Sequence, residues 1–263
     1  MTHLLETREL TIRFGGLTAV NEVDFYVDGG EAVGLIGPNG SGKTTLFNLL
    51  TGIYRPTKGQ IQYGGQDLVG LPAFQIARRG IARTFKNNRL FLNLSVLDNV
   101  LVGMHADQNS NWFDAIFRGN YVKKDLQRGV KKALDLLALF SEDLARNCYK
   151  RATDLPQADW RKVEICRALA CNPKLLLLDE PSAGMSPEET EELMGDIQKV
   201  RTMTKSLGII LIEHDMMVIR EVAERVVVLN YGRKVAEGSF QAISRNEQVL
   251  EAYLGREDGD ASA

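Results

Sequence analysis

The segment GPNGSGKTT, residues 37–45, has residue types and spacing that suit the binding of a phosphate chain. It fits the pattern G-x-x-x-x-G-K-[ST] and lies between the apolar run AVGLI and the helical stretch TLFNLL. Its glycines let successive backbone N–H groups face one anion, to which the helix N-terminus adds its dipole. Within this P-loop we expect Lys43 to neutralise the β- and γ-phosphates and the Thr44 hydroxyl to ligate Mg²⁺. The other loop residues expected to contact the nucleotide are Asn39, Gly40, Ser41, Gly42 and Thr45.

A second group of polar residues follows apolar runs further along the chain. In LLLLDEP, residues 175–181, four leucines predict a buried strand ending at Asp179, which would hold Mg²⁺ directly or through water. Glu180 comes next and is a candidate general base for the attacking water. His214, in LIEHDMM, ends the following apolar strand, where it would contact the γ-phosphate. An acidic pair or a lone histidine is by itself more often structural, and it is the P-loop that favours a catalytic role for both.

The bulk properties are those of an ordinary globular chain. Of its 263 residues, 44% are hydrophobic and 25% are charged, and the formal net charge is −2. The chain thus has no overall positive charge that would attract nucleic acid or an anionic membrane. The three cysteines form no CxxC pair and fit core positions in a reducing compartment. The N-terminus does not resemble a signal peptide, and the longest apolar runs fall short of the ~20 residues that span a bilayer. Any membrane role is therefore expected to depend on a partner.

The order of expected elements predicts a parallel α/β sheet with a helical insertion. The first 70 residues are expected to form mainly strands, with a helix at 44–54, and a short helix and a strand follow at 72–86. Residues 95–170 are mostly helical in period, and after Pro173 apolar strands alternate with helices. The predicted boundaries are an α/β core with its β subdomain at 1–87 and 171–255, a helical subdomain at 88–170, a loop at 109–120 and a disordered tail at 256–263.

This order of P-loop, helical insert, LLLLDEP and IEHD resembles the ATP-binding subunit of an ABC transporter over nearly the whole chain. The phrases RFGGLTAVNEVDF, RRGIARTF, LFLNLSVLDNVLVGMH, IEHDMMVI and VLEAYLG are similar to those of the branched-chain amino-acid uptake ATPases. The resemblance implies a single P-loop NTPase domain with a RecA-like parallel sheet, an N-terminal antiparallel β subdomain and an inserted α-helical subdomain. It also implies ATP and Mg²⁺ as ligands, and it places Phe14 where an aromatic ring stacks on adenine.

Three positions depart from the family pattern. Lys86, in RTFKNN, replaces a glutamine that approaches Mg²⁺ and water; since lysine has no acceptor, we expect it to contact phosphate or an acidic side chain, or to lie on a solvated loop. Ser186 replaces the usual aspartate or asparagine of a loop that communicates between subunits. LPQAD, residues 155–159, replaces the signature Leu-Ser-Gly-Gly-Gln, which in the family acts on the facing subunit's nucleotide. Because Pro156 has no hydroxyl and no N–H and Asp159 is negative, we expect the helix to form there and the chemistry to be weakened.

The sequence therefore predicts the ATP-binding subunit of an ABC importer, an ATP hydrolase whose activity is reduced by LPQAD and Lys86. It would be peripheral on the cytoplasmic face of the membrane, paired with a second ATP-binding subunit (a heterodimer is favoured), two membrane permease subunits and, indirectly, a substrate-binding protein. Nucleic acid is not an expected partner. Branched-chain or other hydrophobic amino acids are the expected cargo, by analogy alone. The alternatives are a weakly hydrolysing regulatory subunit, the ATPase of a urea or amide importer, and a soluble ABC protein acting on nucleic acid or ribosomes, which would usually have two P-loops or a coiled coil.

Overall fold

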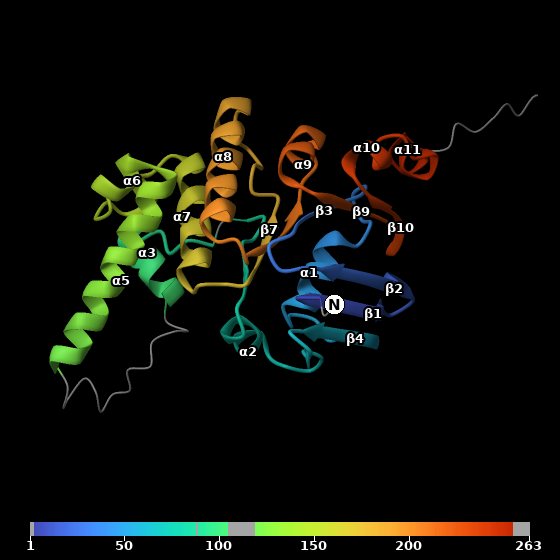
Figure 1. Cartoon of the computed structure of the whole chain (residues 1–263), viewed down its shortest axis with the longest axis horizontal. Coiled ribbons are helices and arrows are strands. Elements are labelled where there is room, and N and C mark those ends of the chain that lie inside the picture. The colour runs from blue at the N-terminus through green and yellow to red at the C-terminus, as the bar shows by residue number, and fades with distance from the viewer. Residues whose placement is uncertain (1–2, 88, 105–118, 255–263) are drawn as a thin grey trace, which may run out of the picture.

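The computed structural model describes residues 3–87, 89–104 and 119–254, which form two β-sheets with helices between and beside them (Figure 1). The larger sheet of this part of the chain has six strands in the order β10-β9-β3-β8-β7-β6, and all but β10 run parallel. Every residue of β3, β7 and β8 is buried, as continuous apolar runs predict for a parallel sheet covered on both faces. The strands are β3 (Ala32–Ile36), β6 (Ile81–Arg83), β7 (Leu175–Asp179), β8 (Gly208–Ile212), β9 (Arg225–Asn230) and β10 (Arg233–Gly238).

A smaller antiparallel sheet, in the order β2-β1-β4-β5, confirms the predicted N-terminal β subdomain. Helix α1 (Lys43–Leu50), which follows the P-loop, packs between the two sheets (Figure 1). Its Leu46 and Phe47 share one apolar cluster with Leu35 of the larger sheet and Phe25 of the smaller one. The start of α1 is thereby fixed relative to both sheets. The strands of the smaller sheet are β1 (Leu5–Phe14), β2 (Leu17–Val27), β4 (Lys58–Tyr63) and β5 (Gln66–Asp67).

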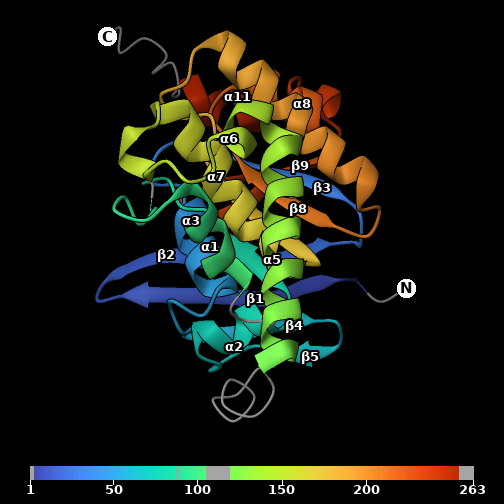
Figure 2. The same ribbon diagram turned by 90° about the vertical axis from the view of Figure 1, so that its left-hand side faces the viewer.

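The helices between β6 and β7 form a separate layer, as the helical period predicts; Figure 2 views this layer with α5 in front. Helices α3, α5 and α7 pack on one another, and their Val100 and Leu137 belong to an apolar cluster that continues onto Leu176 of the larger sheet. The neighbouring Leu177 faces the opposite cluster around α1, since successive strand residues point to opposite faces. The helices of this layer are α3 (Val96–Gly103), α5 (Gly119–Phe140), α6 (Glu142–Arg146), the short 3₁₀ helix η2 (Ala152–Asp154) and α7 (Gln157–Ala170).

The remaining described helices are α2 (Ala73–Arg78), α8 (Pro187–Met203), α9 (Met216–Val222), α10 (Phe240–Ile243) and α11 (Glu247–Leu254). The predicted end of the first helix, at residue 54, is wrong. The helix ends at Leu50 because the Thr51 hydroxyl donates to the Phe47 carbonyl at 2.7 Å and Gly52 takes a left-handed φ of 69°. Cys148, Cys166 and Cys171 form no disulfide, and Cys148 and Cys166 are buried, as expected of core residues.

Several other elements were not predicted from the sequence. Strand β10 was missed because its side chains are half-buried on both faces and show no alternation, and α6, α10 and α11 were too short to give a clear period. Residues 119 and 120 belong to α5 rather than to the predicted loop. Residues 109–118 of the predicted loop and the predicted disordered tail at 256–263 lie outside the described residues.

Arg225, at the start of β9, ties three parts of the core together. Its guanidinium contacts both carboxylate oxygens of Glu31, at 2.7 and 2.9 Å, and also the carboxylate of Glu237. It donates to the Tyr26 carbonyl at 2.8 Å and lies 4.0 Å from the centroid of the same tyrosine ring. These groups are largely buried, so loss of the arginine would leave two carboxylates in a poorly solvated place.

We therefore expect Arg225→Met to lower the free energy of unfolding by about 3 kcal/mol, the lower end for breaking a buried pair, because some solvent reaches the site. Urea unfolding of the full chain measures this. Arg8→Met is the matched control: Arg8 pairs with Glu6 on the exposed surface, so its loss should cost much less stability than the loss of Arg225. Equal losses in the two variants would show that Arg225 adds nothing beyond a surface pair.

The loss should also depend on pH. Burial acts to raise the pKa of the Glu237 carboxyl, but Lys234 and Arg225 outweigh it and hold the pKa below its ordinary value of 4.5. A lowered pKa contributes stability that is present above the ordinary pKa and is lost as the pH falls through the lowered one. The destabilisation by Arg225→Met should therefore be smaller at pH 4 or below than at pH 7.

Candidate nucleotide-binding and hydrolysis site

The loop that joins β3 to α1 requires glycine near both of its ends. Gly37 has a φ of 147°, and a Cβ there would lie 2.1 Å from the carbonyl oxygen of Leu229. Gly42 has a φ of 104°, and its Cβ would lie 2.6 Å from the carbonyl oxygen of Ala19. Both distances are too short for a carbon–oxygen contact, so space and conformation alike exclude a side chain. The loop is thus held between the strands β2 and β9.

Lys43, the first residue of α1, is buried beneath this loop. Its ammonium donates to the carbonyl oxygens of Gly37 at 2.7 Å and Pro38 at 3.0 Å, so the charge is fixed to the loop that would surround a phosphate. Burial lowers the pKa of the Lys43 ammonium and Lys86 adds to this effect, whereas the Glu180 carboxylate opposes it. A cation held this way suits an anionic ligand, because a bond to a phosphate oxygen would pair two opposite charges, whereas a bond to a carbonyl oxygen has only one charged partner.

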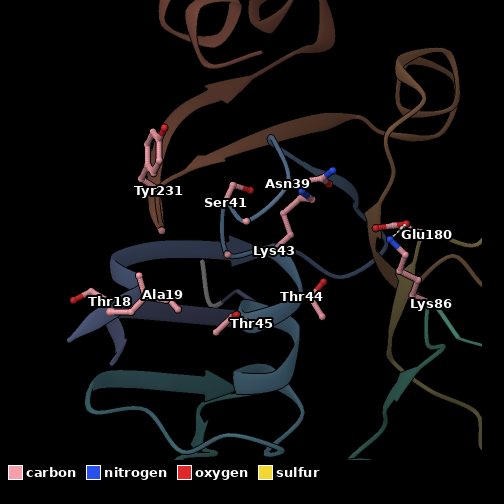
Figure 3. A pocket seen from close by; sticks show the side chains of 14 residues that line it. Thr18, Ala19, Asn39, Ser41, Lys43, Thr44, Thr45, Lys86, Glu180 and Tyr231 are labelled. Atoms are coloured by element: carbon pink, nitrogen blue, oxygen red, sulfur yellow. Dashed lines mark ion pairs between the residues drawn. The ribbon is translucent and has the colours of Figure 1, made fainter. Parts of the chain in front are cut away.

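The P-loop opens into a cavity of about 550 Å³ (Figure 3). In Figure 3 Lys86 and Glu180 lie on one side of Lys43, and Thr18, Ala19 and Tyr231 lie on the other. The structure thus brings together all the P-loop residues predicted to contact nucleotide and two residues far away in the sequence. The described residues of the lining are Asn39, Gly40, Ser41, Gly42, Lys43, Thr44, Thr45, Lys86, Glu180, Leu17, Thr18, Ala19, Tyr231 and Gly232.

The last five of these were not predicted. Leu17, Thr18 and Ala19 begin β2, and Tyr231 and Gly232 form the turn between β9 and β10. Tyr231 adopts a positive φ of 45° and is 87% exposed. No local sequence signal marks these residues, because only the packing of the turn and of β2 against the P-loop places them at the cavity.

Phe14, predicted to stack on adenine, lies outside the described lining of this cavity. It is the last residue of β1, is 44% exposed, and packs edge-on against Tyr54 with the ring centroids 5.2 Å apart. The predicted contact with adenine stays a prediction.

Asp179, at the end of β7, is fully buried and fixed on one side. Its Oδ2 accepts from the Arg83 guanidinium at 2.8 Å, and Arg83 also donates to Asn48 of α1 at 2.7 Å. Its Oδ1 is buried without a hydrogen-bond partner among the described residues. An orphaned carboxylate oxygen of this kind has a place for a cation or for a water bound to one.

The donor set fits the Mg²⁺ that the sequence predicts. Thr44 and Asp179 both offer hard oxygen ligands, which Mg²⁺ prefers. Among the described residues no group of three or more His, Cys, Asp or Glu side chains could hold a metal by itself. A cation here would accordingly take its other ligands from phosphate and water, which is how Mg²⁺ usually binds.

Glu180 has a carboxylate with both oxygens engaged. Oε1 lies 2.9 Å from His214 Nε2, and Oε2 lies 2.7 Å from the Lys86 ammonium. Its backbone adopts a positive φ of 49°, which is held by an N–H bond to the Ile212 carbonyl at 2.9 Å. Burial acts to raise the pKa of this carboxyl, but the bonds from Lys86 and His214 outweigh it and the pKa lies below its ordinary value. The structure thus brings the two candidate catalytic residues, Glu180 and His214, into contact. It also places Lys86 on Glu180, and an acidic side chain was one of the contacts predicted for this lysine.

The segment LPQAD begins α7, as predicted, with Pro156 immediately before the first helical residue, Gln157. Burial raises the pKa of the Asp159 carboxyl, Lys162 opposes this, and nearby carboxylates including Glu192 add to the rise. Within the described lining, no residue of 155–159 borders the P-loop cavity of the same chain. This arrangement is compatible with a role for the segment on a facing subunit.

Ser186 acts as a helix cap in this structure. Its hydroxyl accepts from the Glu189 N–H at 3.2 Å, and the Glu189 carboxylate accepts from the Ser186 N–H at 2.8 Å. This reciprocal pair is a capping box that starts α8. Two residues earlier, a Cβ on Gly184 would lie 3.1 Å from the side-chain nitrogen Nε2 of Gln157, so this loop passes close to the side chain at the start of α7.

Helix α7 also holds the backbone that carries Lys86. The Arg161 guanidinium donates to the carbonyl oxygen of Phe85 at 3.0 Å and to that of Lys86. The Phe85 N–H donates to the Glu164 carboxylate at 3.3 Å. One buried pair on α7 therefore fixes the main chain at Phe85 and Lys86, and the helix that begins with LPQAD is tied to the residue that contacts Glu180.

Comparison with known proteins places this fold and site in one family. The ABC transporter family matches residues 20–183, and the branched-chain amino acid ATP-binding cassette transporter family matches residues 233–259. The chain belongs to the ABC transporter family of ATPases.

Curated relatives match it over nearly their full length. The high-affinity branched-chain amino acid transport ATP-binding protein BraF of Pseudomonas aeruginosa is 40% identical over 254 residues, covering 96% of this chain and 98% of the relative. LivG of Escherichia coli, which bears the same description, is 41% identical over the same shares. The crystal structure of the ADP conformation of MJ1267, an ATP-binding cassette of an ABC transporter, superposes with a TM-score of 0.82 at 27% identity, over 97% of this chain and 100% of that one.

We expect Lys43→Ala to weaken ATP binding by about ten- to a hundredfold, because one or more charge-assisted hydrogen bonds to phosphate are lost. Calorimetry on the purified chain measures this. Lys58→Ala is the matched control, since Lys58 is an exposed lysine paired with Glu9 outside the cavity. Equal affinity in wild type and Lys43→Ala would contradict the assignment of Lys43.

Proposed function

We propose that this chain is the ATP-binding subunit of an importer and couples ATP binding and hydrolysis to the uptake of branched-chain or other hydrophobic amino acids. The observation that carries the proposal is the cavity in which Lys43, Thr44 and Glu180 meet, in a chain that belongs to the ABC transporter family. The cargo is supported by relatives that are described as branched-chain amino acid transport proteins and match nearly the whole chain. Members of such a family use the same ATPase fold for the transport of many different cargoes, so the cargo must be tested separately.

Each residue of the site has its own proposed role in ATP hydrolysis. Lys43 and the loop N–H groups would hold the β- and γ-phosphates. Thr44 and Asp179 would hold Mg²⁺, which supplies neutralisation of the developing charge, and Arg83 keeps Asp179 in position at 2.8 Å. Glu180 would orient the attacking water and accept its proton, with His214 at 2.9 Å fixing the carboxylate and approaching the γ-phosphate.

The proposed assembly is a pair of ATP-binding subunits on two membrane permease subunits, with a substrate-binding protein acting on the permeases. No helix among the residues the structure describes is long and apolar enough to cross a membrane. The proposed location is the cytoplasmic face of the membrane, where the ATP-binding subunits bind the permeases. ATP binding would close the pair of ATP-binding subunits and hydrolysis would reopen it, and the helical layer would transmit this movement to the permeases.

The LPQAD segment favours a partner that differs from this chain. It would face the partner's nucleotide with Pro156, which lacks both a hydroxyl and an N–H, and with the carboxyl group of Asp159. Lys162 and several carboxylates including Glu192 lie near this group. Two copies of this chain would have two impaired sites. A partner with an intact signature would leave one site built on this chain's Lys43, Asp179 and Glu180. We therefore propose a heterodimer with unequal sites.

The cargo is tested by reconstituting the chain in vesicles with its permeases, its second ATP-binding subunit and the substrate-binding protein. We expect ATP-dependent uptake of labelled leucine that unlabelled isoleucine and valine suppress. Lys43→Ala should abolish most of the uptake, and Lys58→Ala should not. Uptake of urea or a short amide instead of leucine would replace the proposed cargo and leave the ATPase role intact.

The ATPase activities of the two nucleotide sites are measured separately by inactivating one catalytic glutamate at a time, Glu180 or its counterpart in the partner, in the same complex. Losing one hydrogen bond to a charged phosphate costs roughly 1.5–3 kcal/mol, and 1.36 kcal/mol is about tenfold in rate. The site that faces LPQAD should therefore be about tenfold slower or more. Glu180→Gln should remove most ATPase activity, and the same change in the partner should remove little. The reverse result would contradict our interpretation of LPQAD.

A further inference from the structure

Lys86 and Glu180, which both line the cavity, form an ion pair. The proposed chemistry does not require this pair. The Lys86 ammonium lies 2.7 Å from Glu180 Oε2, and the dashed line in Figure 3 marks this contact beside the P-loop. The other oxygen, Oε1, is taken by His214 at 2.9 Å. A general base accepts a proton from the attacking water, and a cation held on Oε2 makes the carboxylate a weaker proton acceptor.

The two side chains differ in freedom. The Lys86 side chain is 57% exposed, whereas the Glu180 side chain is only 9% exposed and is held by His214 and by its own backbone N–H bond. The main chain at Lys86 is fixed by Arg161 of α7. Only the flexible stem of the lysine is free to move, so its ammonium can shift within the cavity while Glu180 stays in place.

A bound nucleoside triphosphate would bring its terminal phosphate between these groups and Lys43. Lys43 is fixed by two loop carbonyls, and Lys86 and Glu180 line the same cavity. An ammonium has three donors, so one lysine can contact a carboxylate and a phosphate together. The volume that it would then fill, between carboxylate and terminal phosphate, is where an attacking water must lie. A diphosphate has no group to offer at that point.

We propose that Lys86 is a positioning residue that acts as a brake: its ammonium bridges Glu180 and the terminal phosphate of ATP, so that the site retains ATP and hydrolyses it slowly. This inference rests on the proposed ATPase function and adds a regulation of the same site. The brake is specific for the triphosphate, because ADP leaves the ammonium on Glu180 alone. A movement of α7 that carried the backbone of Lys86 away from Glu180 would relieve it, since Arg161 of that helix holds this backbone.

The inference is tested with Lys86→Met and Lys86→Gln in the reconstituted complex, with the partner's catalytic glutamate inactivated so that turnover comes from the site built on Glu180. We expect kcat to rise about threefold, which is a small part of the 10²- to 10⁴-fold that general-base catalysis supplies. This is less than the roughly tenfold or greater loss expected at the site that faces LPQAD, so the site built on Glu180 stays the faster of the two. Lys86→Arg keeps the cation and should keep the low rate. An unchanged or lower kcat in the Met and Gln variants would overturn the brake.

Binding to the full chain gives a second readout that does not depend on turnover. The affinity for the non-hydrolysable analogue AMP-PNP should fall about three- to fivefold in Lys86→Met, the range for one partly exposed ion pair, and the affinity for ADP should stay within about twofold. Equal changes for the two nucleotides would overturn the bridge to the terminal phosphate. If the wild-type chain bound neither nucleotide, the proposed function itself would fail.

Lys199→Met is the matched control. Lys199 is 62% exposed and contacts the buried Asp196 at 2.8 Å, so it forms the same kind of pair as Lys86 but lies on α8, outside the described lining of the cavity. It should change neither kcat nor the preference for AMP-PNP over ADP. A rise in kcat equal to that of Lys86→Met would show that the effect comes from losing any such pair.

Discussion

The close passage of the P-loop between two strands is the constraint on which the site depends. Gly37 lies against the Leu229 carbonyl and Gly42 against the Ala19 carbonyl, at distances that leave no room for a side chain. The Gly232 N–H donates to the Ser41 carbonyl at 3.0 Å, and the Gly232 carbonyl accepts from Asn21 at 2.8 Å. These backbone bonds join the two sheets at the loop, so the position of Lys43 and the walls of the cavity follow from main-chain packing.

The two carboxylates at the end of β7 are adjacent in sequence but have opposite surroundings. Asp179 is buried with the buried Arg83, a pair that is costly to break and therefore rigid. Glu180 is paired with the exposed Lys86, and pairs of this kind are weak and easily exchanged. The strand ends at Asp179 and the chain turns at Glu180, whose φ is 49°, so the two neighbours reach different partners. A carboxylate with a fixed partner suits the holding of a cation, and one whose partner can move suits proton transfer that can be regulated.

The departures from the family pattern look independent in the sequence, yet α7 connects two of them directly. It begins with LPQAD, and its Arg161 binds the main chain of Lys86. Its Gln157 also lies against Gly184, two residues before the cap formed by Ser186. The LPQAD segment, the backbone of Lys86 and the loop before α8 therefore all lie along one helix.

The sequence by itself determined the P-loop, the buried parallel strands, the helical insertion and the helix start at LPQAD, because each depends on local period, glycine conformation or capping. It also named Glu180 and His214, since strand ends of a parallel sheet meet at one edge. Only the tertiary structure decided that Lys86 binds Glu180, that Tyr231 and the start of β2 line the cavity, and that Phe14 lies against Tyr54. These are contacts between segments far apart in the chain, and side-chain types alone do not specify which of several oppositely charged or apolar partners the packing brings within reach.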